Sequence, residues 1–329
     1  MKRNINWIPN FTSVFKNELK DYILFKRSNG YIYNKVKCYE LLKLDKFFNQ
    51  INLKEKYINQ EIIDLWLKEC SSNNKKTTKA KYFSRISCFC RYLRMLSYEN
   101  IIQPESHNLI YHSDFIPYIF NESEIQRMFK IAKENSSIDR NYKTFYVMLC
   151  LYYCCGLRFS ELHNLKIKNY LENEQKIIIT ESKNMITREI PLSVSTYNIL
   201  SKYIKNNNYL YSEDYVFKNV KNKRISAYMI RKYYNELLEN AVIPVRYDGK
   251  RQRIHDLRHT FAVNSLKQME KKGFDLYTST SVLSVYLGHK SITETEYYLR
   301  LVQEEAKRCQ EEIKNYTSGL YESKVIYSE

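Results

Sequence analysis

The sequence predicts a mainly α protein with a small β hairpin, and three observations support this fold class. Apolar residues recur at helical spacing through most of the chain. Only two short segments, Lys176–Glu181 and Arg188–Leu192, have the composition of strands. The 329 residues suffice for two domains with separate cores. We therefore expect a helical domain over residues 1–110, a linker over 111–120 and a second domain over 121–329.

Four stretches of the N-terminal domain have the apolar spacing of helices and would form a bundle that ends near Pro104: residues 10–29, 31–50, 59–70 and 75–96. The fourth is the most basic, with no acid between residues 71 and 98. Its cations would face outward, which suits a helix lying along a phosphate backbone, and a merely solvated basic helix is the alternative. They are Lys75, Lys76, Lys79, Lys81, Arg85, Arg91 and Arg94.

The net charge also points to a polyanionic partner. The formal charge is +17, and residues 1–110 hold 20 lysines and arginines against 10 acids. For a protein of this composition nucleic acid is the first candidate, with lysine-rich solvated faces as the alternative.

Several classes of site and location are excluded by what the sequence lacks. Its eight cysteines include no CxxC pair, and Cys150, Cys154 and Cys155 lie in an apolar run as buried thiols do. There is no glycine-rich nucleotide motif and no acidic cluster for magnesium, so we expect no cofactor and no metal. With no signal peptide and no apolar stretch of 18 residues, we expect a cytoplasmic protein with reduced thiols.

The second domain is predicted to alternate helices with one hairpin. Asn121 and Glu124 indicate the start of a helix over residues 122–134, and an apolar helix follows from Phe145 to Cys155. In the segment GLRFSEL, Gly156 ends that helix and Glu161 lies in the next. Lys183 lies in the turn of the hairpin, and further helices are expected near residues 193–205 and 226–240.

The most informative stretch runs from His255 to Tyr298, because it holds three of the six histidines of the chain. It opens with HDLRHT, in which His255 and Arg258 point from one helix face, and closes with YLGHKSITETEYYLRL. Imidazoles, a guanidinium and a phenol without metal-ligand spacing suit a site for a phosphate and a covalent nucleophile.

Taken together, five motifs make the chain resemble the tyrosine recombinases, or phage-type integrases, across roughly residues 121–300. They occur in the family's order: GLRFSEL around Arg158, Lys183 eight residues before Pro191, HDLRHT, LGHKSIT and Tyr298. The resemblance implies that the N-terminal helices form a core-binding DNA domain. It also implies that a catalytic domain follows and ends in a C-terminal exchange helix.

Phosphoryl transfer explains why these residue types are needed. Attack on a phosphodiester builds charge on its oxygens, and the planar fork of arginine donates paired hydrogen bonds to them. The resemblance assigns Arg158 and Arg258 to this clamp, with structural salt bridges as the alternative. It also implies that His289 binds a phosphate oxygen and that His255 is a general base or organises the attack. For His289 a lone core or surface histidine is the alternative.

Two further roles follow from the resemblance. Lys183 would protonate the leaving 5′ oxygen, although a solvated hairpin lysine is an alternative and Lys176 and Lys166 are nearby. Glu161 and His259 would orient the arginines and the helix without touching the phosphate.

Spacing decides between two candidate nucleophiles, because the chain has 31 tyrosines. The family places the nucleophile nine residues after the histidine of LGH, which selects Tyr298 over Tyr297. A tyrosine hydroxyl has a pKa near ~10, so it needs help to attack at neutral pH.

One departure from the family pattern lies between Arg258 and His289, where this chain is several residues longer. The segment FDLYTSTSVLSVYLGH resembles a subgroup of transposon-encoded recombinases. We expect the extra residues, around Lys271 to Ser281, to enlarge a loop.

The function implied is site-specific recombination through a 3′-phosphotyrosine, for integration or excision of a mobile element. The expected assembly is a homo-tetramer on two double-stranded DNA sites, associated with the nucleoid, with an accessory DNA-bending or excision factor as a further expected partner. The alternatives are a type IB topoisomerase and a non-catalytic DNA-binding accessory protein.

Overall fold

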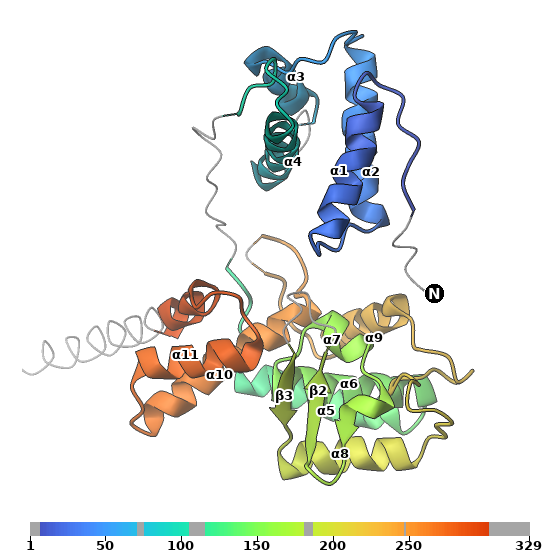
Figure 1. Ribbon diagram of the computed structural model, residues 1–329. Coiled ribbons are helices and arrows are strands. Elements are labelled where there is room, and N and C mark those ends of the chain that lie inside the picture. The colour runs from blue at the N-terminus through green and yellow to red at the C-terminus, as the bar shows by residue number, and fades with distance from the viewer. Residues whose placement is uncertain (1–6, 71–75, 105–115, 181–186, 247, 303–329) are drawn as a thin grey trace, which may run out of the picture. The chain divides into compact units, whose positions relative to one another are not determined.

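The computed structural model describes residues 7–70, 76–104, 116–180, 187–246 and 248–302 (Figure 1). The chain divides into two compact units, residues 1–115 and 116–329, called here the N-terminal and the C-terminal unit. Helices dominate both, and the described residues hold one small sheet, which confirms the predicted mainly α fold. None of the helices in these ranges has the length and apolar character needed to cross a membrane.

Four helices build the N-terminal unit: α1 Lys16–Ser28, α2 Lys35–Gln50, α3 Gln60–Glu69 and α4 Lys76–Met95. All four predicted helices are therefore present. The first begins at Lys16 rather than near residue 10, because the Asp45 carboxylate accepts the N–H groups of Thr12 and Ser13 at 3.0 and 2.9 Å and holds this segment outside the helix. The core of the unit is aromatic, with Phe15, Phe48 and Trp66 fully buried.

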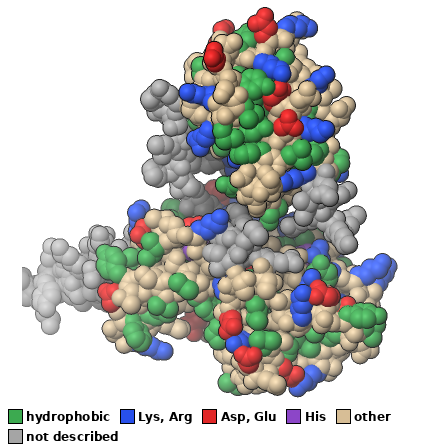
Figure 2. Space-filling model, viewed as in Figure 1, with side chains coloured by type: hydrophobic (Ala, Val, Ile, Leu, Met, Phe, Trp, Pro, Cys, Tyr) green, Lys and Arg blue, Asp and Glu red, His purple; other side chains and the backbone are tan. Residues whose placement is uncertain are grey.

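Helix α4 has the predicted two faces. Its apolar stripe is buried: Phe83, Ile86, Phe89, Cys90 and Leu93. On the other face Lys81, Arg91 and Arg94 are exposed and Lys79 is half-buried, whereas Arg85 pairs with Glu40. Lys75 and the side chain of Lys76 lie outside the described residues. On the faces visible in Figure 2, lysines and arginines are scattered among apolar and acidic side chains.

The C-terminal unit is built around α6 Arg140–Cys155, which packs against α5 Glu122–Ser136, α8 Val194–Lys205 and α10 Ile254–Lys271. Asn121 and Glu124 form a capping box at the start of α5, as the sequence predicts. Helix α6 begins before the predicted Phe145 because Asp139 caps it by accepting the N–H of Asn141 at 2.7 Å.

The buried-thiol prediction for α6 is correct for two cysteines and wrong for one. Cys150 and Cys155 are buried, whereas Cys154 is exposed. Cys150 and Cys154 lie near one side of the helix at i, i+4 spacing, so spacing alone does not account for the exposure of Cys154. Cys154 lies at a stretch of α6 that borders a surface groove.

A three-stranded antiparallel sheet carries the hairpin, with β1 Tyr170–Leu171, β2 Lys176–Ile179 and β3 Arg188–Pro191 in that order. In the register Ile177 pairs with Ile190, and both are buried. The two predicted strands are confirmed. The tip of the hairpin, residues 181–186 with Lys183, lies outside the described residues.

The remaining described elements are α7 Phe159–His163, the 3-10 helix η1 Ile167–Asn169, α9 Ala227–Asn240, α11 Leu276–Leu287 and a helical segment over residues 293–302. The expectation of an enlarged loop around Lys271 to Ser281 is wrong. Helix α10 continues through Lys271, and Asp275 starts α11 by accepting the N–H of Thr278 at 2.7 Å. The extra residues therefore mostly form helix, with a short connection between them.

Candidate active site

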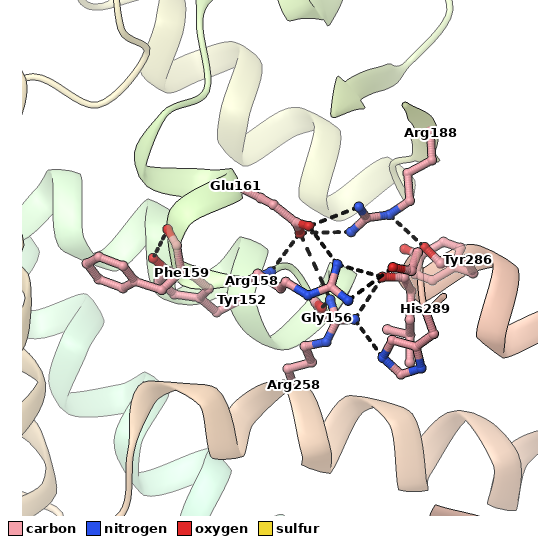
Figure 3. A network of polar contacts seen from close by, with 11 residues as sticks. Tyr152, Gly156, Arg158, Phe159, Glu161, Arg188, Arg258, Tyr286 and His289 are labelled. Atoms are coloured by element: carbon pink, nitrogen blue, oxygen red, sulfur yellow. Dashed lines mark hydrogen bonds and ion pairs between the residues drawn. The ribbon is translucent and has the colours of Figure 1, made fainter. Parts of the chain in front are cut away.

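Two arginines from distant parts of the sequence meet at the C-terminal end of α11 (Figure 3). Arg158, the residue before α7, donates to the carbonyl of Gly288 at 3.0 Å. Arg258, on α10, donates to the carbonyls of Leu287 and Gly156, each at 2.8 Å. The last carbonyls of a helix lack partners inside it and carry its negative dipole end. They therefore suit two guanidinium groups.

Gly156 makes this approach possible. It ends α6 with φ +58°, a left-handed conformation that favours glycine. A Cβ atom at this position would lie 2.4 Å from the ring of Phe261. The tight turn brings the Gly156 carbonyl to Arg258 and places Arg158 two residues later.

Glu161 is the centre of the arginine cluster. Its carboxylate accepts from the side chain of Arg158 at 2.9 Å and from both Nη atoms of Arg188 at 3.0 and 2.8 Å. The nearest nitrogen of Arg258 lies 4.0 Å away. Burial by itself would raise the pKa of Glu161, but the hydrogen bonds and charges of Arg188 and Arg158 lower it to about 2. Glu161 is therefore ionised at neutral pH.

Arg188 belongs to this site and was not among the residues predicted from sequence. It opens β3, is buried, and also donates from Nε to the carbonyl of Tyr286 at 2.9 Å. Its side chain packs against Gly288, where an added Cβ atom would lie 3.0 Å from Nη1. Arg188 shares the buried face of its strand with Ile190, so strand alternation was the one available signal of an inward arginine.

Charge in this cluster is unbalanced. Within the described part of the chain, the guanidinium groups of Arg158, Arg188 and Arg258 surround a single carboxylate. Burial, and then the charge of Arg158, lowers the pKa of Arg258 to about 10, which leaves it protonated at neutral pH. The site therefore carries excess positive charge held in place by carbonyl groups, an arrangement suited to an anion.

His289 follows Gly288, which ends α11 with φ +66°. Its Nε2 lies 3.0 Å from Nη2 of Arg258 and its Nδ1 lies 2.7 Å from Oγ1 of Thr295. Arginine can only donate, so Nε2 must accept and Nδ1 must carry the hydrogen. Burial, and then the charges of Arg258 and Arg158, lowers the pKa of His289 to about 3, so the ring is neutral in this state.

Tyr298 is buried in the helical segment 293–302 at the edge of the cluster. Its hydroxyl lies 2.8 Å from Nδ1 of His259. Burial raises the pKa of this hydroxyl, although Arg258 and Arg158 act in the opposite direction. The neighbouring Tyr297 is half-buried, with its ring inclined by 60° to that of Tyr298.

The two histidines of α10 occupy different places around Tyr298. The ring of His255 packs edge-on against His259, with centroids 4.7 Å apart. Of these two histidines, His259 is the one for which the described structure shows a hydrogen bond with the Tyr298 hydroxyl. His259, for which the resemblance implies a role in orienting the arginines, thus contacts the expected nucleophile directly.

The structure brings six of the predicted residues into this one region: Arg158, Glu161, Arg258, His259, His289 and Tyr298. His255 joins them through His259. Lys183 lies outside the described residues. Of the other lysines considered for its role, Lys176 pairs with Glu189 at 2.8 Å and Lys166 with Glu213 at 2.9 Å.

Residues 119–305 match the model of the phage integrase family. A tyrosine recombinase of Pseudothermotoga lettingae is 29% identical over 265 residues, which are 78% of this chain and 82% of that protein. Tyrosine recombinase XerC of Staphylococcus aureus is 26% identical over 274 residues, 82% of this chain and 86% of that protein. The putative integrase/recombinase y4rB of Sinorhizobium fredii is 27% identical over 191 residues, and the chain spans only 61% of that protein.

Two solved structures have a similar fold. The Tn1549 transposon integrase in complex with transposon right end DNA matches with a TM-score of 0.63 and 15% identity, covering 89% of this chain and 99% of that one. The XerH site-specific recombinase bound to palindromic difH substrate matches with a TM-score of 0.64 and 17% identity, covering 92% and 90%. At these identities the likeness concerns the fold.

Proposed function

The chain belongs to the phage integrase family and is a tyrosine-type site-specific recombinase, and we propose that Tyr298 is its nucleophile and duplex DNA its substrate. The observation that carries this proposal is the arginine cluster. Three guanidinium groups, of which those of Arg188 and Arg258 are buried, surround one carboxylate, and a phenol hydroxyl lies beside them with a histidine partner. A phosphodiester would offset part of the excess positive charge and place phosphorus next to the nucleophile.

In the proposed reaction the Tyr298 oxygen attacks the scissile phosphorus and the bond to the 5′ oxygen breaks. The products are a 3′-phosphotyrosine and a free 5′ hydroxyl. Arg158 and Arg258 stabilise the charge that develops on the non-bridging oxygens, an effect worth about 3 kcal/mol per well-placed donor. The phosphotyrosine keeps the energy of the broken bond, so a second 5′ hydroxyl can reverse the step on a partner strand.

His289 needs a hydrogen on Nε2 to donate to a phosphate oxygen. It accepts from Arg258 in the resting state, so it has no hydrogen on Nε2 to donate to a phosphate oxygen. Burial, and then the charges of Arg258 and Arg158, lowers the pKa of His289 to about 3, so a change of tautomer costs less than protonation. We propose that phosphate binding takes Arg258 from His289 and that the neutral ring then carries its hydrogen on Nε2, with the Thr295 hydroxyl donating to Nδ1.

The leaving 5′ oxygen also needs a proton. Lys183 is the proposed donor, on the evidence of its place in the hairpin between β2 and β3. Arg188 supports this assignment, because it ties the first residue of β3 to Glu161 and so anchors the base of the hairpin beside the arginines.

For the assembly we propose a tetramer on two DNA sites, held by exchange of the chain after residue 305. A groove of about 1180 Å³ in the C-terminal unit could receive such a segment. Phe120, Tyr153 and Phe261 contribute apolar lining, and Lys267 and Lys271 contribute cations that suit the acids of the tail. A chain truncated at residue 305 should still cleave its site. It should not form the tetramer in sedimentation experiments, and it should not complete strand exchange.

We further propose that the DNA sites lie at the ends of a mobile element, as the name of the Tn1549 transposon integrase suggests by analogy. The cationic face of α4, with Lys81, Arg91 and Arg94, is the proposed backbone contact of the N-terminal unit. Footprinting on DNA that flanks the gene identifies the site.

The decisive test uses a nicked suicide substrate built on the footprinted site, from which the short 5′-hydroxyl fragment diffuses away after cleavage. Wild-type protein should form a covalent protein–DNA adduct that resists denaturation. Tyr298→Phe should form none, while Tyr297→Phe, the matched control, should react like wild type. An adduct that persists in Tyr298→Phe and disappears in Tyr297→Phe would contradict the assignment. Relaxation of supercoiled DNA without a specific site would instead indicate a topoisomerase.

A further inference from the structure

The hydroxyl of Tyr298 already has a polar partner in the resting structure. It lies 2.8 Å from Nδ1 of His259, and the two rings are inclined by 50° with centroids 5.5 Å apart. Tyr298 is buried and His259 is half-buried. This is the separation at which a phenol can pass its proton directly to an imidazole.

His259 holds this position because of its place on α10. It follows Arg258, and His255 lies one helical turn earlier on the same face. The edge of one imidazole meets the face of the other at 4.7 Å. The order of contacts among these described side chains is therefore His255, His259 and Tyr298, with the phenol at the end next to the arginine cluster.

The surroundings of His259 favour its neutral form in the resting structure. Burial, and then its charged and titratable neighbours His255, Arg253, Arg258 and His289, lowers the pKa of His259 to about 2. The charge of Glu294, in the same helical segment as Tyr298, raises the pKa of the Tyr298 hydroxyl. A neutral ring can accept a proton, but an imidazolium among these arginines would be unfavourable. A phosphate bound to Arg158 and Arg258 would reduce that cost, so proton transfer becomes favourable only with DNA in the site.

We propose that His259 accepts the phenol proton of Tyr298 during strand cleavage and returns it during rejoining. The inference rests on the proposed function of Tyr298. As the bond between the Tyr298 oxygen and phosphorus forms and the bond to the 5′ oxygen breaks, the proton moves from the phenol to Nδ1. The leaving oxygen takes its proton from another donor. In the reverse step the tyrosine leaves phosphorus and recovers its proton from His259.

The test measures single-turnover cleavage of the nicked substrate between about pH 5.5 and pH 9. His259→Asn is the informative variant, because the amide oxygen can replace Nδ1 as a hydrogen-bond acceptor but cannot take the proton. General-base loss typically costs about 100-fold or more, so cleavage should fall by that factor near neutral pH. The deficit should shrink as pH rises towards ionisation of the phenol itself. DNA affinity should stay within about threefold of wild type.

A second substrate separates His259 from the donor to the leaving group. When sulfur replaces the bridging 5′ oxygen, the leaving thiolate needs no proton. Lys183→Ala should then recover most of its lost rate, whereas His259→Asn should remain slow. Recovery of His259→Asn on this substrate would overturn the proposal and assign the residue to the leaving group.

The remaining outcomes are also distinguishable. A His259→Asn or His259→Ala variant that cleaves at the wild-type rate or faster across the pH range overturns the proposal and makes the contact a restraint on the resting tyrosine. Thermal unfolding identifies a variant that fails to fold, in which case His259→Gln takes its place. If wild-type protein forms no adduct, the proposed function itself fails. If wild type reacts and the variant is unaffected, only the role of His259 fails.

Discussion

The two units bury charge in opposite ways. In the N-terminal unit the core is aromatic, and its buried acids meet neutral or partly exposed partners: Asp45 accepts backbone N–H groups, and Glu18 accepts from Lys56 and Tyr98 at 2.7 and 2.8 Å. In the C-terminal unit Glu161 and Arg258 have almost no exposed surface and lie within one cluster of charges.

The two arrangements differ in the cost of removing charged groups from water. Partners at the edge of a core, such as Lys56 with its side chain 41% exposed, hold a polar group in place at little desolvation cost. Buried charges lose several kcal/mol of hydration each, and replacing them by apolar residues often improves stability. We therefore attribute the cluster around Glu161 to the phosphate that we propose it binds, and not to a gain in stability.

Both tryptophans of the chain, Trp7 and Trp66, lie in the N-terminal unit, which makes the comparison measurable. Tryptophan fluorescence follows unfolding of that unit, and far-ultraviolet circular dichroism follows both. A substitution that acts on the C-terminal unit alone should shift only the dichroism transition.

The largest effect is expected from Glu161→Gln. The amide keeps the shape of the side chain but leaves Arg158 and Arg188 without a counter-charge, so the C-terminal unit should lose about 3–5 kcal/mol of unfolding free energy. Glu18→Gln is the matched control in the N-terminal unit and should cost about 1 kcal/mol or less. Urea unfolding measures both. Equal losses would contradict the proposed difference between the units.

A smaller effect is expected from glycine substitutions. Gly156→Ala adds a Cβ atom 2.4 Å from Phe261 to a residue with φ +58°, and it should cost about 3 kcal/mol. Gly30→Ala has φ +76° but no atom within 4 Å of the new Cβ, so it should cost only about 1 kcal/mol. The pair separates backbone strain from steric conflict. Similar losses in thermal unfolding would show that Phe261 moves aside.

The smallest effect for each ionisable group is expected when the pH is lowered. The pKa values of His255, His259 and His289 are lowered to about 4, 2 and 3 in the folded chain, from 6.5. The unfolded chain therefore binds protons at these histidines at a pH where the folded chain does not, and stability is lost as pH falls below about 6.5.

Each histidine should cost up to about 2 kcal/mol between about pH 7 and pH 5. Below about pH 4.5 protonation of Glu161, whose folded pKa is about 2, adds a further loss. Residues 1–104 contain no histidine, so the fluorescence transition should stay nearly constant between these two pH values. A parallel decline of both transitions would refute this account.

Much of the fold follows from local patterns. Helix α4 was predicted within a residue at either end, because an apolar stripe and a run of cations leave few alternatives to an amphipathic helix. Asn121, with Glu124 three residues later, placed the start of α5. Where a predicted helix start failed, a distant acceptor or an overlooked cap was responsible: Asp45 of α2 binds the segment before α1, and Asp275 caps α11.

The sequence by itself determined which residues could carry the chemistry, because motif order and spacing select Arg158, Arg258, His289 and Tyr298 from a chain rich in lysine and tyrosine. Only the tertiary structure decided how they meet. The entry of Arg188 into the cluster and the contact of His259 with Tyr298 join residues 27 and 39 positions apart. Such contacts depend on how strand, helix and turn pack together, and that packing cannot be predicted from the spacing of residues along the chain.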